Sequence, residues 1–117
     1  MSDRDPDCLF CKIASGDIPS DRVYEDDAVI AFRDIHPQAP THVLVVPRRH
    51  VPDVDTLADD DAGLLSALFA AVRRVAELEG LAKGYRVVTN VGAESGQSVF
   101  HLHLHLLGGR RMRWPPG

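Results

Sequence analysis

Apolar and polar residues alternate in one segment near the C-terminal end of the chain, FHLHLHLLGG at residues 100–109. Side chains of a strand point alternately to its two faces, so His101, His103 and His105 would share one face and the leucines between them the other. The aromatic residue before these histidines and the two glycines at the end fit the start and the stop of a strand. The pattern therefore predicts a half-buried strand with one imidazole face.

Four more strands are predicted from the rest of the chain. Residues 23–26 (VYED) and 28–34 (AVIAFRD) have strand composition on either side of a tight acidic turn, and residues 42–47 (HVLVVP) and 85–91 (YRVVTNV) add two further candidates. Short turns join most of these segments, which favours antiparallel pairing. We therefore expect a five-stranded antiparallel sheet.

One long helix is predicted between the third and fourth of these strands. Asp59, Asp60 and Asp61 favour a helix start, and apolar residues recur at helical spacing from there to about Glu79. The positions of this stripe are Leu64, Leu65, Leu68, Phe69, Val72, Val75 and Ala76. Together with a short amphipathic helix at the N-terminal end, these elements indicate an α+β fold.

The length of 117 residues fits a single domain, residues 1–117, with residues 110–117 as a C-terminal tail. The chain has no internal repeat and no low-complexity tract. Its formal net charge is −4, and its basic residues are scattered except for Arg110, Arg111 and Arg113. Nucleic acid is therefore a poor candidate partner, whereas a small anion bound by local geometry stays open.

The N-terminal sequence MSDRDPD is polar and acidic, and the longest apolar stretch, residues 64–72, is interrupted by Ser66. Neither segment has the character of a membrane span or of a secretory leader. We therefore expect no membrane association and a cytoplasmic location.

The three clustered histidines are candidates for chemistry, because imidazole is the side chain whose charge changes near neutral pH. The alternatives are a solvated strand face and a His-x-His zinc pair. Neighbouring imidazoles on a strand lie about 7 Å apart at their bases and the outer two about 13 Å, so all three cannot easily bind one metal ion. The preceding loop, NVGAESGQSVFH at residues 90–101, contains glycines and small donors, which suits close approach of the main chain to an anion.

The segment GQSVFHLHLHLLGG at residues 96–109 resembles the signature of the histidine triad nucleotide-binding proteins, His-φ-His-φ-His-φ-φ with φ apolar. Residues 24–50 and the terminal WPPG are similar to the branch that hydrolyses purine nucleoside phosphoramidates. The nucleotidyl-transferase branch would carry glutamine at the third position, where this chain has His105. The resemblance implies the histidine triad (HIT) fold of this family and hydrolysis of the P–N bond in adenosine or guanosine phosphoramidates, including AMP-lysine.

For the chemistry, the resemblance implies that His103 is the nucleophile and forms a covalent nucleotidyl-histidine intermediate, which water then hydrolyses. Imidazole suits this role because its ordinary pKa of about 6.5 leaves it neutral at pH 7. His105 would donate to the α-phosphate oxygens. His42 would orient the triad by hydrogen bonding, and its alternative is an ordinary histidine at the start of a strand. Further groups around the phosphate would come from Gly96, Gln97 and Ser98. Either Ser98 or a neighbouring histidine would protonate the leaving amine, and no metal is expected in the reaction.

The resemblance also implies a nucleotide pocket for AMP, GMP and their phosphoramidates. Asp34 would accept hydrogen bonds from both ribose hydroxyls, and Asn90 would line the pocket. Taken alone, an aspartate at a strand end is usually a turn former, and the alternative for Asn90 is a turn or a cap. The base would lie against apolar side chains of Phe10, Phe32 or Ile35, where buried area rather than hydrogen bonding supplies affinity.

Cys8 and Cys11 have the two-residue gap that lets two thiolates bind one tetrahedral zinc ion. Two cysteines are half of such a site, so other ligands must come from elsewhere. Bacterial members of the family imply His50 and His101 as these ligands, which gives a structural zinc distant from the reacting phosphorus. The alternative is two free thiols on a short helix.

Three functional classes follow: a phosphoramidase, a nucleotide-binding module with incidental turnover, and a zinc-dependent hydrolase whose triad is the metal site. Dinucleoside polyphosphates are further candidate substrates.

The strand pattern at residues 85–91 has apolar side chains on both faces, so it would be a hazardous exposed edge unless another chain covers it. The family resemblance implies a two-fold homodimer that joins two sheets into one continuous ten-stranded sheet. The tail, with Trp114 followed by two prolines, would contact the partner's pocket. The alternative for this tail is a frayed terminus.

Overall fold

The structure is a computed structural model that describes residues 4–117, in which five strands form one antiparallel sheet. The strand order is β1-β2-β3-β5-β4, so β1 and β4 lie at its two edges. The strands are β1 (Arg22–Glu25), β2 (Val29–Arg33), β3 (Thr41–Pro47), β4 (Tyr85–Val88) and β5 (Leu104–Gly108). The predicted α+β class and the five-stranded antiparallel sheet are confirmed.

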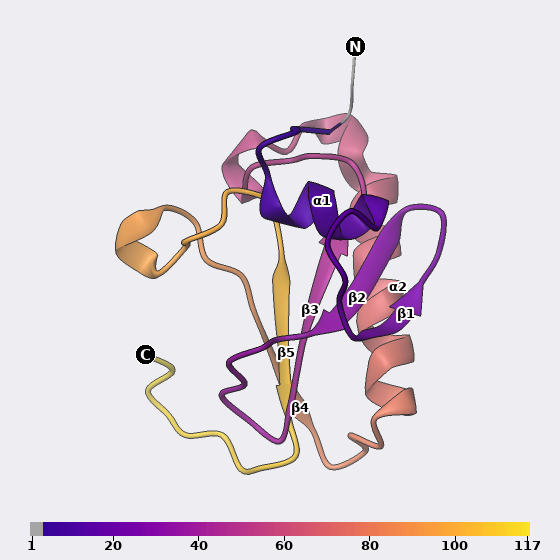
Figure 1. Cartoon of the computed structure of the whole chain (residues 1–117). Coiled ribbons are helices and arrows are strands. Elements are labelled where there is room, and N and C mark those ends of the chain that lie inside the picture. Colours follow the sequence, from indigo (N-terminus) through magenta and orange to yellow (C-terminus); the bar gives the residue numbers. More distant parts are fainter. Residues whose placement is uncertain (1–3) are drawn as a thin grey trace.

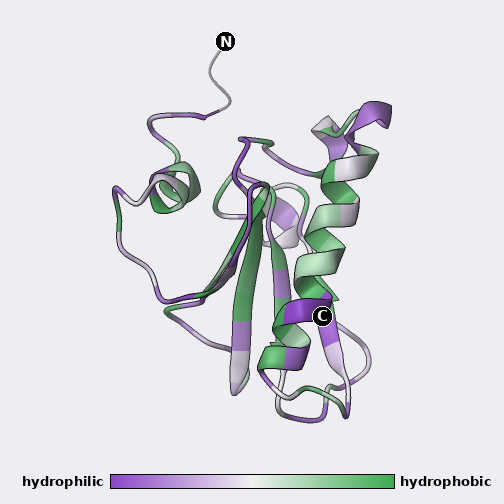
Figure 2. Ribbon diagram, turned by 90° about the vertical axis from the view of Figure 1, so that its right-hand side faces the viewer, coloured by the Kyte–Doolittle hydropathy of each residue, from purple (hydrophilic) through white to green (hydrophobic). Residues whose placement is uncertain are grey.

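A helix covers each face of the sheet, so the molecule has three layers (Figures 1 and 2). The helices are the short α1 (Leu9–Ser15) and the long α2 (Ala62–Leu78), both of which the sequence predicts. Short 3-10 turns lie in the connections, at Val54–Thr56, Asp59–Asp61 and Ala93–Ser95. Among residues 4–117, no helix is both long and apolar enough to span a membrane.

β2 and β3 are buried on both faces because each face packs against a different helix. The side chains that pack with α2 are Val29, Ala31, Val43 and Val45. The intervening side chains pack with α1 and are Ile30, Phe32, Leu44 and Val46. The alternation of two apolar sets along the same strands explains why these segments read as continuous apolar runs.

α2 buries one stripe of its surface against the sheet. Leu68, Val72 and Val75 recur at helical spacing and are at most 2% exposed. Leu65 and Phe69 belong to the predicted stripe but are 37% and 48% exposed. The apolar surface of α2 is therefore wider than the area that its own sheet covers.

The structure corrects the predicted histidine strand. The strand ladder of β5 begins at Leu104, so His101 and His103 precede it. The predicted alternation persists before the ladder, because Leu102 packs with Leu104 in the cluster beneath α2. The imidazole face is not half-exposed as predicted, since His101 is fully buried and His103 is 7% exposed beneath α1.

The predicted strand at residues 85–91 is also too long, because β4 ends at Val88. The hydroxyl of the next residue, Thr89, donates a hydrogen bond to the main-chain oxygen of His103 at 2.9 Å. Gly92, with φ +86°, then turns the chain into the loop before the triad.

Candidate active site and metal cluster

Histidines from three places meet on the α1 side of the sheet. His42 lies on β3, His105 lies on β5, and His103 lies just before β5. His105 pairs with Leu44 across the two strands, and strand geometry places His42 on the same face as Leu44. The pairing of β3 with β5 therefore brings these imidazoles together.

His103 has a defined tautomer. Its Nδ1 lies 2.7 Å from the main-chain oxygen of His101, a group that can only accept, so Nδ1 carries the proton and Nε2 carries a lone pair. Burial lowers the pKa of His103, so the ring is neutral at pH 7. The ring of Phe10 packs edge-on against it at a centroid distance of 5.0 Å. His103 thus offers a positioned, uncharged nucleophile.

His42 and His105 form a chain of hydrogen bonds. The main-chain N–H of Gln38 donates to Nδ1 of His42 at 3.0 Å, so the proton of this ring lies on Nε2. Nε2 of His42 is 2.9 Å from Nδ1 of His105, and it donates to that atom. His105 therefore carries its own proton on Nε2, where it can donate to an anionic oxygen.

The two hydrogen-bonded imidazoles, those of His42 and His105, are both neutral at pH 7. Burial lowers the pKa of His42. Burial, together with the neighbouring rings of His103 and His42, lowers the pKa of His105 to about 4. Each ring therefore has one donor and one acceptor nitrogen, so the donor and the acceptor of each hydrogen bond are unambiguous.

Asp34 follows β2 and lies beside the hydrogen-bonded pair of His42 and His105. Its Oδ1 accepts a hydrogen bond from the main-chain N–H of His36 at 2.8 Å. Its Oδ2 lies 3.5 Å from Nε2 of His42. The next residue, Ile35, is 87% exposed, so it offers an open apolar surface next to the carboxylate.

The two phenylalanines predicted at the base pocket have a different environment from Ile35. Phe10 and Phe32 are both 4% exposed and pack edge-to-face at a centroid distance of 5.6 Å. They therefore belong to the core beneath α1, whereas Ile35 is open to a ligand.

The loop before the triad places Asn90 and Gly96 side by side. A Cβ added at Gly96, whose φ is +107°, would lie 3.8 Å from Nδ2 of Asn90. Ser98 is exposed. The amide of Gln97 is buried and bonds only inside the protein, to the main chain of Gly92, Pro52 and Val99. The side chain of Gln97 therefore shapes the loop and is not free to bind a ligand.

A second cluster lies at the other end of the histidine segment. Its ligand atoms, which all lie within 4.8 Å of one another, belong to Cys8, Cys11, His50 and His101. Nδ1 of His101 is 3.4 Å from Sγ of Cys8 and 3.2 Å from Nδ1 of His50. Sγ of Cys11 is 3.4 Å from Nδ1 of His50.

These spacings fit a tetrahedral ion of the size of zinc. Ordinary Zn–S and Zn–N bonds place a sulfur and a nitrogen ligand about 3.6 Å apart and two nitrogens about 3.3 Å apart. Nε2 of His101 donates to the main-chain oxygen of Pro47 at 2.7 Å, so its Nδ1 faces the cluster with a lone pair. Burial raises the pKa of the Cys11 thiol, an effect that a bound cation would offset. The cluster could therefore hold a metal ion.

Asp34, His42 and His105 also lie close enough together to be considered as metal ligands. The hydrogen bond from Gln38 to Nδ1 of His42 puts the proton on Nε2, which is the atom facing the other two groups. A protonated nitrogen cannot bind a metal. The hydrogen bonding therefore favours a metal-free arrangement here.

A family model described as the HIT domain matches residues 15–112. The chain belongs to the HIT family. A HIT-like protein of Synechococcus elongatus is 49% identical over 111 residues, which cover 95% of this chain and 97% of that protein.

Solved structures of HIT proteins share this fold. A HIT family hydrolase from Legionella pneumophila is 53% identical, with a TM-score of 0.93 over 95% of this chain and 100% of that one. A histidine triad protein from Clostridium difficile is 42% identical, with a TM-score of 0.91 over 94% of this chain and 96% of that one. The predicted family and fold are confirmed, and the chain has the fold of HIT family hydrolases.

A carbonyl partner for the second ring nitrogen of His103 was expected, but the sequence did not identify which main-chain groups orient the imidazoles of this HIT domain. They are the N–H of Gln38 and the carbonyls of Pro47 and His101. No sequence signal could have found them, since every residue has such groups and only the fold aims them.

Trp114 was expected at a partner's pocket. It is 80% exposed and lies against Arg86 of its own chain, with 5.7 Å between Cζ of Arg86 and the centroid of the Trp114 ring.

Proposed function

We propose that this HIT protein is a purine nucleoside phosphoramidase, which hydrolyses the P–N bond of purine nucleoside 5′-phosphoramidates. The observation that carries the proposal is the tautomer of His103, whose Nδ1–H donates to a carbonyl and whose Nε2 keeps a lone pair. His105, at the third triad position, supports hydrolysis over transfer to a second substrate. The purine preference rests on the family resemblance.

In the first step, Nε2 of His103 attacks the α-phosphorus, the P–N bond breaks, and the amine leaves with a proton from Ser98 or a neighbouring histidine. The Nε2–H of His105 donates to a phosphate oxygen, which stabilises the charge that develops there. In the second step, water attacks the phosphorus, the bond to His103 breaks, and the proton that the water loses returns to the group that protonated the amine. The products are the free amine and the nucleoside monophosphate.

The nucleotide would lie between the loop after β2 and the loop before the triad. Asp34 would bind the ribose hydroxyls, and the exposed Ile35 would cover the base. Asn90, Gly96 and Ser98 would bind the phosphate side. This pocket also suits dinucleoside polyphosphates, which are the second candidate substrate because they present the same nucleotide.

We further propose that the cluster of Cys8, Cys11, His50 and His101 holds a structural zinc ion. The spacings and the orientation of His101 support this, and two thiolates with two imidazoles are a common zinc ligand set. The ion would tie α1 and the N-terminal segment to the sheet. The reaction itself would use no metal.

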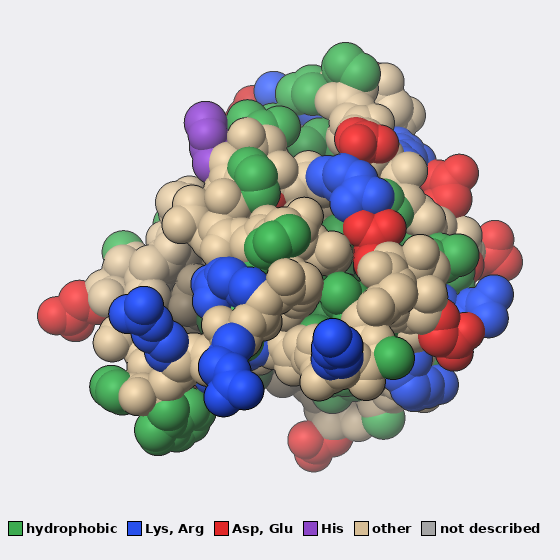
Figure 3. Space-filling view, turned by 90° about the horizontal axis from the view of Figure 1, so that it is seen from below, with side chains coloured by type: hydrophobic (Ala, Val, Ile, Leu, Met, Phe, Trp, Pro, Cys, Tyr) green, Lys and Arg blue, Asp and Glu red, His purple; other side chains and the backbone are tan. Residues whose placement is uncertain are grey.

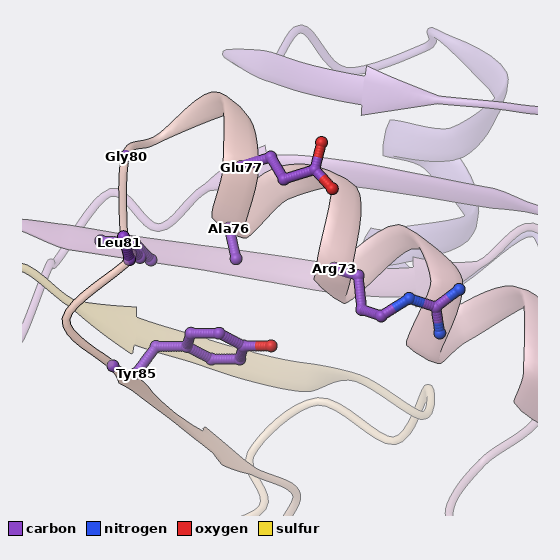
Figure 4. Close-up of a pocket in the computed structure, with 8 residues that line it drawn as sticks. Arg73, Ala76, Glu77, Gly80, Leu81 and Tyr85 are labelled. Carbon is purple, nitrogen blue, oxygen red and sulfur yellow. The ribbon is translucent and has the colours of Figure 1, made fainter.

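We also propose a homodimer in which β4 pairs with its copy to make a ten-stranded sheet. β4 is an edge strand, and an unpaired edge of this kind favours pairing with another chain. The exposed Leu65 and Phe69 of α2 supply an apolar surface for the second copy. A hollow of about 350 Å³ between the end of α2 and Tyr85 lies beside this edge (Figure 4). Trp114 would then lie near the partner, where it could contact the partner's pocket.

Turnover of adenosine 5′-phosphoramidate by the wild-type protein and by His103→Ala tests the proposed activity. Removing the nucleophile should lower kcat by at least about 10³-fold, whereas AMP affinity should fall far less. Rapid acid quench of the wild type should trap a nucleotide on the histidine segment. Near wild-type turnover by the variant would show that His103 is not the nucleophile, and retained turnover in strong chelator would exclude the zinc-dependent alternative.

A further inference from the structure

The segment that follows β5 packs against the loop that follows β2. Nε and Nη2 of Arg110 lie 3.3 and 3.1 Å from the main-chain oxygen of Gln38, and both donate to it. The preceding residue, Gly109, has φ +88°, and a Cβ added there would lie 2.9 Å from Cβ of Pro40. A larger residue at this position would therefore separate the two segments.

Gln38 connects this contact to the catalytic histidines through its other main-chain group. Its carbonyl accepts from Arg110, while its N–H donates to Nδ1 of His42. Nε2 of His42 then donates to Nδ1 of His105. The contact with the C-terminal segment and the hydrogen bond to His42 thus meet at the backbone of one residue, Gln38, and His42 links this residue to the imidazole that faces the substrate phosphate in the proposed function.

We infer that Arg110 is a positioning residue that holds Gln38 in place and so keeps the catalytic proton of His105 on Nε2. The inference rests on the proposed function, because the donor role of His105 is part of that proposal. Arg110 acts on the site through Gln38 and His42, and its Nη1 also donates to the main-chain oxygen of Arg111 at 3.2 Å.

The direction of the hydrogen bond between His42 and His105 explains why one exposed arginine can affect the reaction. Without a donor at Nδ1 of His42, that ring can move its proton to Nδ1, and the bond to His105 can reverse. His105 would then present a lone pair to the anionic phosphate oxygen, which repels it. The nearby Oδ2 of Asp34, 3.5 Å from Nε2 of His42, favours the productive direction, so loss of Arg110 should weaken the bias without abolishing it.

The surface around Arg110 supplies a matched control. Lys and Arg side chains gather at the lower end of the molecule (Figure 3), where Arg110 and Arg111 both line a hollow of about 1040 Å³ beside β4. Arg110→Ala and Arg111→Ala remove the same charge from the same surface. Only Arg110→Ala removes the donors to Gln38.

The experiment compares these two variants with the wild type on adenosine 5′-phosphoramidate. Loss of the bonds to Gln38 should lower kcat of Arg110→Ala about fivefold, with KM changed less than about twofold, because a net hydrogen bond of this strength corresponds to that factor. Arg111→Ala should keep wild-type kcat. Arg110→Lys, which can still donate one hydrogen bond, should lie between Arg110→Ala and the wild type.

Nitrogen-15 NMR of the histidine rings in the substrate-free protein gives a second measurement. The wild type and Arg111→Ala should show His105 protonated at Nε2, and Arg110→Ala should show a mixture of both tautomers. This measurement needs no substrate, so it tests the inference even if the proposed reaction is wrong.

A second pair of variants acts directly on the donor. Gln38→Pro lacks the N–H, and Gln38→Ala keeps it. The proline variant should have about tenfold lower kcat than the alanine variant and the same mixture of His105 tautomers. Equal kcat for Arg110→Ala and Arg111→Ala, or an unchanged His105 tautomer in Arg110→Ala, would overturn the inference.

Discussion

The buried imidazole of His105 should make the protein less stable at acid pH. Burial and its neighbouring histidines lower the pKa of His105 to about 4, whereas in the unfolded chain it has its ordinary value of 6.5. Between these two values the unfolded chain binds a proton that the folded chain does not. The free energy of unfolding therefore falls as the pH decreases from 6.5 towards 4, and this contribution levels off below pH 4.

The size of this effect follows from the difference between the two pKa values. A difference of about 2.5 pKa units corresponds to at most about 3 kcal/mol. Between pH 7 and pH 5 the same two values give a loss of about 2 kcal/mol. The pKa values of His42 and His103 are also lowered by burial, so these rings titrate in this range too, and the contribution of His105 must be separated by comparison with a variant.

His105→Gln supplies this comparison, because glutamine does not titrate and its amide oxygen can still accept from Nε2 of His42. Urea unfolding at pH 7, 6 and 5, at a fixed protein concentration, should show the wild type losing about 2 kcal/mol more than His105→Gln. His36→Gln, which replaces an exposed ring, is the control and should follow the wild type. Parallel stability curves for the wild type and His105→Gln would refute the reasoning.

Three further predictions concern the metal, the dimer and packing. Protein purified without metal-affinity steps should contain about one zinc per chain by elemental analysis, and a zinc content well under half an equivalent would contradict the site. Cys8→Ser should lower the stability of the protein, measured as Tm, more than it lowers catalysis, measured as kcat. Light scattering at micromolar concentration should give the mass of two chains for the wild type and of one for Phe69→Glu; a wild-type monomer would exclude the dimer. Gly108→Ala should cost about 1 to 3 kcal/mol of unfolding free energy, because its Cβ would lie 2.7 Å from Cδ1 of the buried Leu81. Gly63→Ala in α2 meets nothing within 4 Å and should be neutral or stabilising by up to about 1 kcal/mol, so equal destabilisation of both variants would contradict this difference.

Helix and strand identity could be predicted from the sequence because each depends on local periodicity. The stripe of α2 and the alternation of His101 to Leu106 identify which side chains share a face, whatever else the chain does. Strand ends were less predictable. β4 ends at Val88, where the hydroxyl of the next residue, Thr89, donates to the main-chain oxygen of His103. β5 starts directly after His103, at Leu104.

The sequence by itself determined the residue types of the site, including the histidine triad, the cysteine pair and the aspartate after the second strand. Only the tertiary structure decided what each residue can do. His101 faces the cysteines and His105 faces His42, although both lie on the same alternating segment. Their protonation depends on main-chain groups of Pro47 and Gln38, which the sequence does not distinguish from any others. The physical reason is that periodicity fixes the face on which a side chain lies, whereas tautomer and pKa depend on burial and on partners brought together from distant parts of the chain.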